Sequence, residues 1–155
     1  MSGYIAITTS DWINSIKANG ISCAVFWCKK KNFIALSPGE KFYFLEKGQF
    51  SSSADRFIVG VGEFCRFEKV DSSQAWDKYS NALGFDTEQD FKNKIKNIYH
   101  SDENFDLGCI VLNQVRFYKR KLSLEECDID FSPYIVSGKK LDTKDCNKIE
   151  SKSKE

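Results

Sequence analysis

The apolar residues of this chain come in short β-prone segments separated by turns. Residues 4–8 and 41–45 are segments of this kind, and residues 57–67 form a longer one with Gly60 and Gly62 at its centre. Glycines inside a strand pattern are typical of a bulge or a sharp barrel corner, and no helix or Lys-Ser/Thr follows them as a phosphate loop requires. The pattern therefore predicts a small domain rich in β-structure.

Helical signals interrupt these segments in two places. Ser10 suits an N-cap, with Trp12, Ile13 and Ile16 on one face of the helix that follows. Residues 71–98 predict two further helices, the first ended by Gly84 and the second carrying Phe91, Ile95 and Ile98. Residues 21–27, 107–112 and 115–118 complete the strand candidates. We expect an α+β fold, a partly closed β-barrel of about six strands with flanking helices.

Length and composition fit one soluble domain. The chain has 155 residues, 41% of them hydrophobic, and no apolar run is long enough to cross a membrane. The net charge of +1 excludes a protein dominated by non-specific attraction to nucleic acid, so phosphate binding would need a local patch. Residues 1–142 are expected to form the domain. Residues 143–155 are polar and are expected to be a disordered tail or linker.

The cysteines and the N-terminus indicate the compartment. None of the six cysteines has the C-x-x-C spacing of a zinc or redox site, and residues 1–6 lack the features of a signal peptide. Reduced thiols in a cytoplasmic protein are the favoured interpretation, with no metal and no cofactor.

His100 is the single histidine, which excludes chemistry that depends on several. Ser101 and Asp102 follow it directly, but neighbours in sequence rarely face one another as a catalytic triad. Glu125-Glu126 and Asp128-x-Asp130 are interpreted as solvated charge, since Ser123 and Glu126 already make a capping box.

Trp27 is the aromatic residue that packing explains least well. It ends an apolar strand segment and is followed by Lys29, Lys30 and Lys31. A flat ring beside a basic loop suits stacking on a base with phosphate contacts nearby. A core tryptophan followed by a solvated hairpin tip remains an equal alternative.

Over residues 4–142 the chain resembles the N-terminal domain of bacterial HNH endonucleases that act as modification-dependent restriction enzymes. Wider relatives are the EVE and YTH domains of the PUA-like superfamily, small β-barrels that read modified bases. Tyr134 departs from the family pattern, which more often has Asn there. The resemblance rests on residues 4–12, 26–27, 33–44, 58–62, 75–76, 108–112 and 132–142.

The resemblance implies a reader that takes a flipped modified base, with modified cytosine in DNA favoured, into an aromatic pocket. An HNH nuclease needs more than one histidine, so this chain is expected to be no enzyme, with a fused or recruited nuclease as its partner. The implied pocket residues are Thr8, Ser10, Asp11, Trp27, Phe44, Ser137 and Lys139. The expected phosphate contacts are Lys29, Lys30, Lys31, Lys139 and Lys140.

Three alternatives remain open at this stage. The first is a reader of methylated adenine in RNA, which belongs to the same superfamily. The second is a barrel that binds a small ligand or a protein, with Trp27 in its core. The third is a hydrolase centred on His100.

Overall fold

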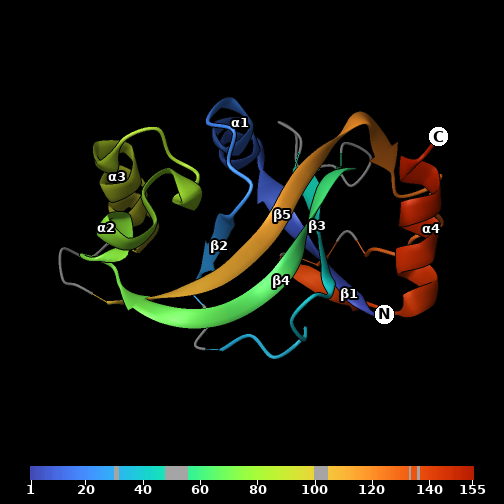
Figure 1. The fold of residues 1–155 in the computed structure, drawn as a ribbon, viewed down its shortest axis with the longest axis horizontal. Coiled ribbons are helices and arrows are strands. Elements are labelled where there is room, and N and C mark those ends of the chain that lie inside the picture. Colours follow the sequence, from blue (N-terminus) through green and yellow to red (C-terminus); the bar gives the residue numbers. More distant parts are fainter. Residues whose placement is uncertain (30–31, 48–55, 100–104, 133, 136) are drawn as a thin grey trace.

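A six-stranded mixed sheet curls around an aromatic interior and carries helices at both ends (Figure 1). The computed structural model describes residues 1–29, 32–47, 56–99, 105–132, 134–135 and 137–155. The strand order is β2-β5-β4-β3-β1-β6; β1 pairs with β3 in parallel and the other pairs are antiparallel. The elements are β1 (Gly3–Thr9), α1 (Ser10–Ala18), β2 (Ala24–Cys28), β3 (Lys41–Lys47), β4 (Phe57–Asp71), α2 (Ala75–Tyr79), the 3-10 helix η2 (Ser80–Leu83), α3 (Glu88–Tyr99), β5 (Asp106–Ser123), β6 (Gly138–Leu141) and α4 (Thr143–Ser153).

Alternation along the central strands divides the apolar residues between the two faces of the sheet. In β3, Phe42 and Phe44 point into the barrel, whereas Tyr43 and Leu45 point to the other face. We call the first group, with α1 packed on it, the inner cluster, and the second the α4 cluster. Both faces are buried, which accounts for the continuous apolar run of this strand.

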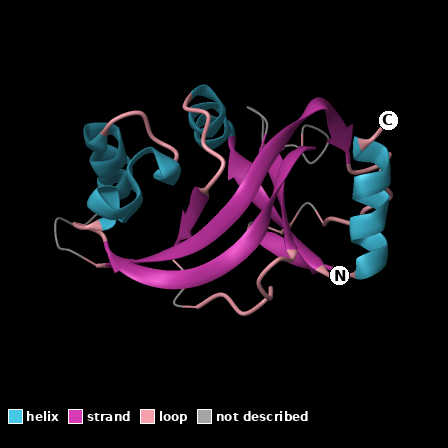
Figure 2. Cartoon of the chain, in the orientation of Figure 1, coloured by secondary structure: helices cyan, strands magenta, loops and turns pink. Residues whose placement is uncertain are grey.

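The two longest strands, β4 and β5, curve along the whole molecule, as Figure 2 shows. Their pairing shifts register at three places, and one shift lies between Ile58 and Gly60. A Cβ at Gly60 would lie 2.8 Å from Cδ1 of Phe117, so only glycine allows this close approach. The predicted role of these glycines as a bulge is confirmed. The prediction of separate strands at residues 107–112 and 115–118 is wrong, because β5 runs through both. Gln114, which lies between them, adopts a positive φ of 48° within the continuous strand.

The helical end of the molecule packs against β2, β4 and β5. Phe91 and Ile95 of α3 are buried there with Leu83, in what we call the helical cluster. Gly84 ends η2 with φ 90°, as predicted. Ile98, predicted to share the core face of α3, is only half-buried.

The expectation of a disordered tail at residues 143–155 differs from the structure, which places α4 there (Figure 1). Asp142 caps this helix by accepting a hydrogen bond from Asp145 N at 2.8 Å. Cys146 and Ile149 are buried in the α4 cluster, and Tyr43 donates a hydrogen bond to Glu150 Oε1 at 2.9 Å. Only Cys146 and Ile149 of the helix are buried, so the polar composition of residues 143–155 gives little sign of a packed helix.

No helix in the described part of the chain is long and apolar enough to cross a membrane.

Candidate functional site

A cleft of about 770 Å³ opens between α1 and the segment that joins η2 to α3. Its floor is the end of β1 and the middle of β2, including Phe26 and Trp27. Figure 1 shows where the ribbons of α1, α3 and β2 lie; residues of all three elements line the cleft. The volume suits a ligand of nucleoside size.

The first wall begins where β1 passes directly into α1. The hydroxyl of Thr9 caps the helix by accepting a hydrogen bond from Trp12 N at 3.3 Å, so the N-cap is Thr9 and not Ser10 as predicted. Trp12 lies below the cleft, and its indole donates to Val25 O at 3.2 Å. The rigid turn leaves the exposed carboxylate of Asp11 on the cleft wall.

Asp86 fastens the opposite wall to α1. Its Oδ1 accepts hydrogen bonds from Ser15 Oγ at 3.1 Å and from Asn19 Nδ2 at 2.9 Å. Asn81 donates to the carbonyls of Phe85 and Asp86 at 2.8 and 3.1 Å. These bonds fix the width of the cleft without filling it.

Trp27 is half-buried on the cleft floor. Its Nε1 donates to Leu83 O at 3.0 Å, so the indole is held in place and its N–H is used. The ring of Phe85 lies 6.0 Å away at an interplanar angle of 31°. A base inserted between the two rings would need about 7 Å, so the packing of Phe85 against Trp27 leaves no room for a base between them.

Acidic and amide side chains dominate the polar part of the cleft. Asp11 and Asp90 line it, and neither carboxylate forms an ion pair within the described residues. The polar face of α3 adds Lys94 and two asparagines, Asn93 and Asn97. The same described residues hold no group of three His, Cys, Asp or Glu that could bind a metal.

Lys29 lies beyond Trp27 at the end of α3. Its exposed ammonium sits 4.8 Å from the centre of the Tyr99 ring. Burial raises the pKa of Tyr99 to about 12, so the ring under Lys29 stays neutral. Lys29 is thus a cation near the cleft, and it forms no ion pair within the described part of the chain.

The structure brings together three of the seven predicted pocket residues. Thr8, Asp11 and Trp27 all line the cleft. Thr8 is buried, and its hydroxyl donates to Ala6 O at 3.0 Å. Ser10 is adjacent, but its hydroxyl is 3.4 Å from Lys47 O and does not line the cleft.

Two other predicted pocket residues lie elsewhere. Phe44 is fully buried among Trp12, Phe42 and Phe117, so its prediction as a pocket wall is wrong. Its position in β3 points it into the inner cluster. Ser137 contacts the neighbouring strand through its backbone, where its carbonyl accepts a hydrogen bond from Ile7 N at 2.7 Å.

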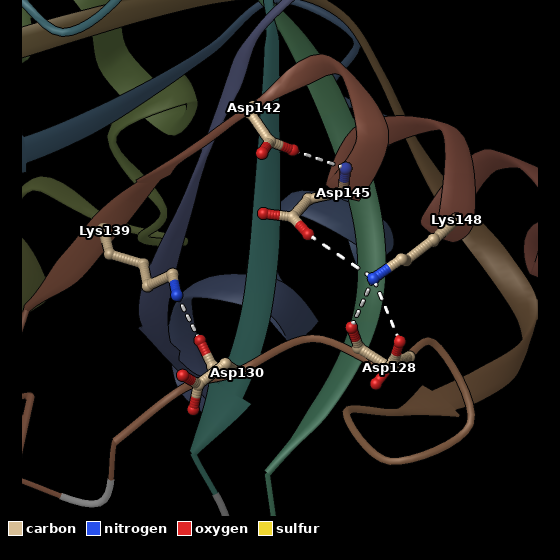
Figure 3. Close-up of polar contacts among 6 residues, drawn as sticks. All are labelled: Asp128, Asp130, Lys139, Asp142, Asp145 and Lys148. Atoms are coloured by element: carbon tan, nitrogen blue, oxygen red, sulfur yellow. Dashed lines mark hydrogen bonds and ion pairs between the residues drawn. The ribbon is translucent and has the colours of Figure 1, made fainter.

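Lys139 lines a different depression, and Figure 3 shows the polar contacts of residues around it. Its ammonium donates to the backbone carbonyl of Asp130, on the side of the molecule that carries α4. Nearby, Lys148 forms ion pairs with Asp128 at 3.0 Å and with Asp145 at 3.8 Å. The expectation that Lys139 lines the pocket is therefore not met, because β6 is at one edge of the sheet and β2, on the cleft floor, is at the other.

Lys140 is exposed on β6, paired in register with Tyr4 and not at the cleft. The predicted contacts Lys30 and Lys31 lie outside the described residues, as does His100.

Sequence reasoning missed the wall that α3 supplies. Asp90, Asn93, Lys94 and Asn97 recur at helical spacing opposite Phe91, and such a face is usually solvated. The spacing of these four residues can be read from the sequence, but the sequence does not show that α1 lies across the cleft from them.

Comparisons with known proteins support the fold. No family model and no curated protein matches the chain. The crystal structure of ASCH from Zymomonas mobilis matches with a TM-score of 0.69 and 13% identity, over 96% of this chain and 94% of that one. A tyrosine-to-phenylalanine variant of that protein gives 0.68 at 12%, covering 96% of both chains, and a serine-to-alanine variant gives 0.67 at 14%, covering 96% and 94%.

The fold is therefore similar to that of ASCH from Zymomonas mobilis. The expected α+β fold, a barrel of about six strands with flanking helices, is confirmed. Membership in the PUA-like superfamily, which the resemblance implies, stays a prediction. The closer likeness to EVE and YTH domains, and the link to restriction endonucleases, stay predictions.

Proposed function

We propose that this domain binds nucleic acid by taking one base into the cleft between α1 and α3, stacked on Trp27. The observation that carries the proposal is an indole held by its hydrogen bond to Leu83 O, with the Phe85 ring 6.0 Å away, in the lining of a cleft of about 770 Å³. Stacking of a base on an aromatic ring contributes about 1–3 kcal/mol.

The charge distribution around the cleft supports a base in the cleft and phosphates outside it. Asp11 and Asp90 on the walls would repel a phosphate, whereas Lys29 lies outside the cleft lining, over the ring of Tyr99. When the sugar-phosphate backbone of the nucleic acid contacts Lys29, the attached base can reach Trp27, two residues away in the sequence.

The finer part of the proposal is that the base is modified and that modified cytosine in DNA is the preferred ligand. A fold similar to that of ASCH is compatible with this preference. We propose further that the domain has no catalytic activity of its own and supplies specificity to a fused or recruited nuclease.

Trp27 both lines the cleft and packs, half-buried, against the helical cluster. Its place in the cleft lining favours base stacking over the alternative of a barrel with Trp27 in its core. A reader of methylated adenine in RNA uses the same cleft and is distinguished by the choice of oligonucleotide.

The test is equilibrium binding of matched single- and double-stranded DNA and RNA, with and without a methylated cytosine or adenine. Wild type should prefer a modified strand, and Trp27→Ala should abolish the preference. Trp76→Ala is the matched control, because Trp76 is a half-buried tryptophan of the helical cluster that does not line the cleft. Equal binding of every oligonucleotide by wild type and Trp27→Ala would overturn the proposal.

A further inference from the structure

The cleft that would hold the base is negatively charged although the whole chain is not. Its lining contains three aspartates, Asp11, Asp86 and Asp90, against one lysine, Lys94, which is a net of two negative charges. The chain as a whole has a net charge of +1. A concave site lined by one sign of charge concentrates ligands of the opposite sign.

The position of these carboxylates keeps them available to a ligand. Asp11 and Asp90 stand in the first turns of α1 and α3, where the helix dipole favours a charged carboxylate. Neither has an ion-pair partner within the described residues, whereas Glu46, Glu63 and Glu126 elsewhere on the surface are paired with Lys or Arg. Asp86 uses one oxygen for Ser15 and Asn19.

An aromatic face beside unpaired carboxylates is the combination that recognises a delocalised cation. The face of an indole attracts positive charge more strongly than other aromatic rings do. A carboxylate also accepts a hydrogen bond from an exocyclic amine such as that of cytosine. A neutral base uses only the stacking and the amine contact, whereas a cationic base gains from both Trp27 and the aspartates.

We infer that the cleft selects a nucleobase that carries a positive charge, and that N3-methylcytosine is the modified cytosine it fits best. This inference rests on the proposed function and names the chemical class of the base. Methylation at N3 places a positive charge on the ring and blocks Watson–Crick pairing. Such a base also costs least to extrude, because it is not held by a partner.

The experiment compares bases that carry one methyl group at different positions, so that the members of a pair differ in charge by one bound proton. Two single-stranded DNA oligonucleotides carry either N3-methylcytosine or 5-methylcytosine at one position, and a second pair carries N1-methyladenine or N6-methyladenine. We expect wild type to bind the cationic member of each pair at least about tenfold more tightly.

Charge-removing variants test the source of that preference. Asp11→Asn and Asp90→Asn keep the side-chain size, and each should reduce the preference by several fold. Asp77→Asn is the matched control, since Asp77 is an exposed aspartate of α2 that lies outside the cleft. A preference that survives in both cleft variants, or falls equally in Asp77→Asn, would overturn the inference.

The inference and the proposed function fail in different ways. If wild type binds both members of a pair equally and Trp27→Ala abolishes this binding, the charge selection is overturned and base binding in the cleft stands. No binding of either isomer, or binding unaffected by Trp27→Ala, would overturn both.

Discussion

The backbone of Gly84 lies flat against the indole of Trp12, and a Cβ at this glycine would be 2.7 Å from Trp12 Nε1. Trp12 belongs to α1 and Gly84 to the segment before α3, so this contact joins the two walls of the cleft. It explains how a cleft of about 770 Å³ persists between elements that are far apart in sequence.

Gly84→Ala should therefore destabilise the domain and displace the α3 wall. Gly84 has φ 90° and Gly39 has φ 92°, but a Cβ at Gly39 would meet nothing within 4 Å. Gly39→Ala measures the backbone strain alone, and the overlap with Trp12 should add about 1–3 kcal/mol in denaturant unfolding. Equal losses in the two variants would show that Trp12 does not constrain this segment.

Asp86→Ala should loosen the same wall by removing the acceptor for Ser15 and Asn19. We expect a loss of about 1–2 kcal/mol in unfolding free energy and faster amide exchange in residues 84–90. Asp77→Ala is the control, because the Asp77 carboxylate forms no ion pair within the described part of the chain. Unchanged exchange in Asp86→Ala would contradict the clamping role.

Ile149→Ala tests whether α4 belongs to the folded domain. Ile149 is fully buried in the α4 cluster, so its truncation should cost about 2–5 kcal/mol. Lys144→Ala, at an exposed position of the same helix, should cost little. A negligible loss for Ile149→Ala would return residues 143–155 to the disordered tail that composition suggests.

The domain should lose stability at alkaline pH. Burial raises the pKa of Cys109 from 9.0 to about 12 and that of Cys127 from 9.0 to about 11. Because the unfolded thiols ionise first, unfolding becomes easier as pH rises from about 9 toward about 12, and stability is full below that window. Denaturant midpoints measured across the window should fall, and Cys109→Ala should make the fall shallower. A midpoint that does not change with pH would show that these thiols ionise equally in both states.

Much of the fold follows from local pattern, as β1 and β3 show. Phe42 and Phe44 alternate with Tyr43 and Leu45, and Gly60 sits where the paired strands shift register. Helix α4 escapes prediction because two buried residues in a Lys-rich segment make too weak a stripe. Its burial depends on the outer face of a sheet formed by distant strands.

The site is less predictable than the fold for the same physical reason. Trp27 and Asp11 stand out in the sequence as a ring at a strand end and a polar group after a strand. Asp90 resembles any solvated helical carboxylate until α3 is placed opposite α1. Phe44 is not a pocket residue because strand alternation points it into the inner cluster. Lys139 is not one because the sheet order places β6 away from the cleft.

The most direct test of the account is an NMR titration with a single-stranded oligonucleotide that carries one N3-methylcytosine. The chain has three tryptophans, and their indole N–H signals can be assigned from Trp→Phe variants. The indole signal of Trp27 should shift together with the amides of Asp11 and Asp90, while that of Trp76 and the amides of α4 stay in place. Shifts that gather instead around Lys139 and Lys148, with Trp27 unaffected, would contradict the assignment of the cleft as the binding site.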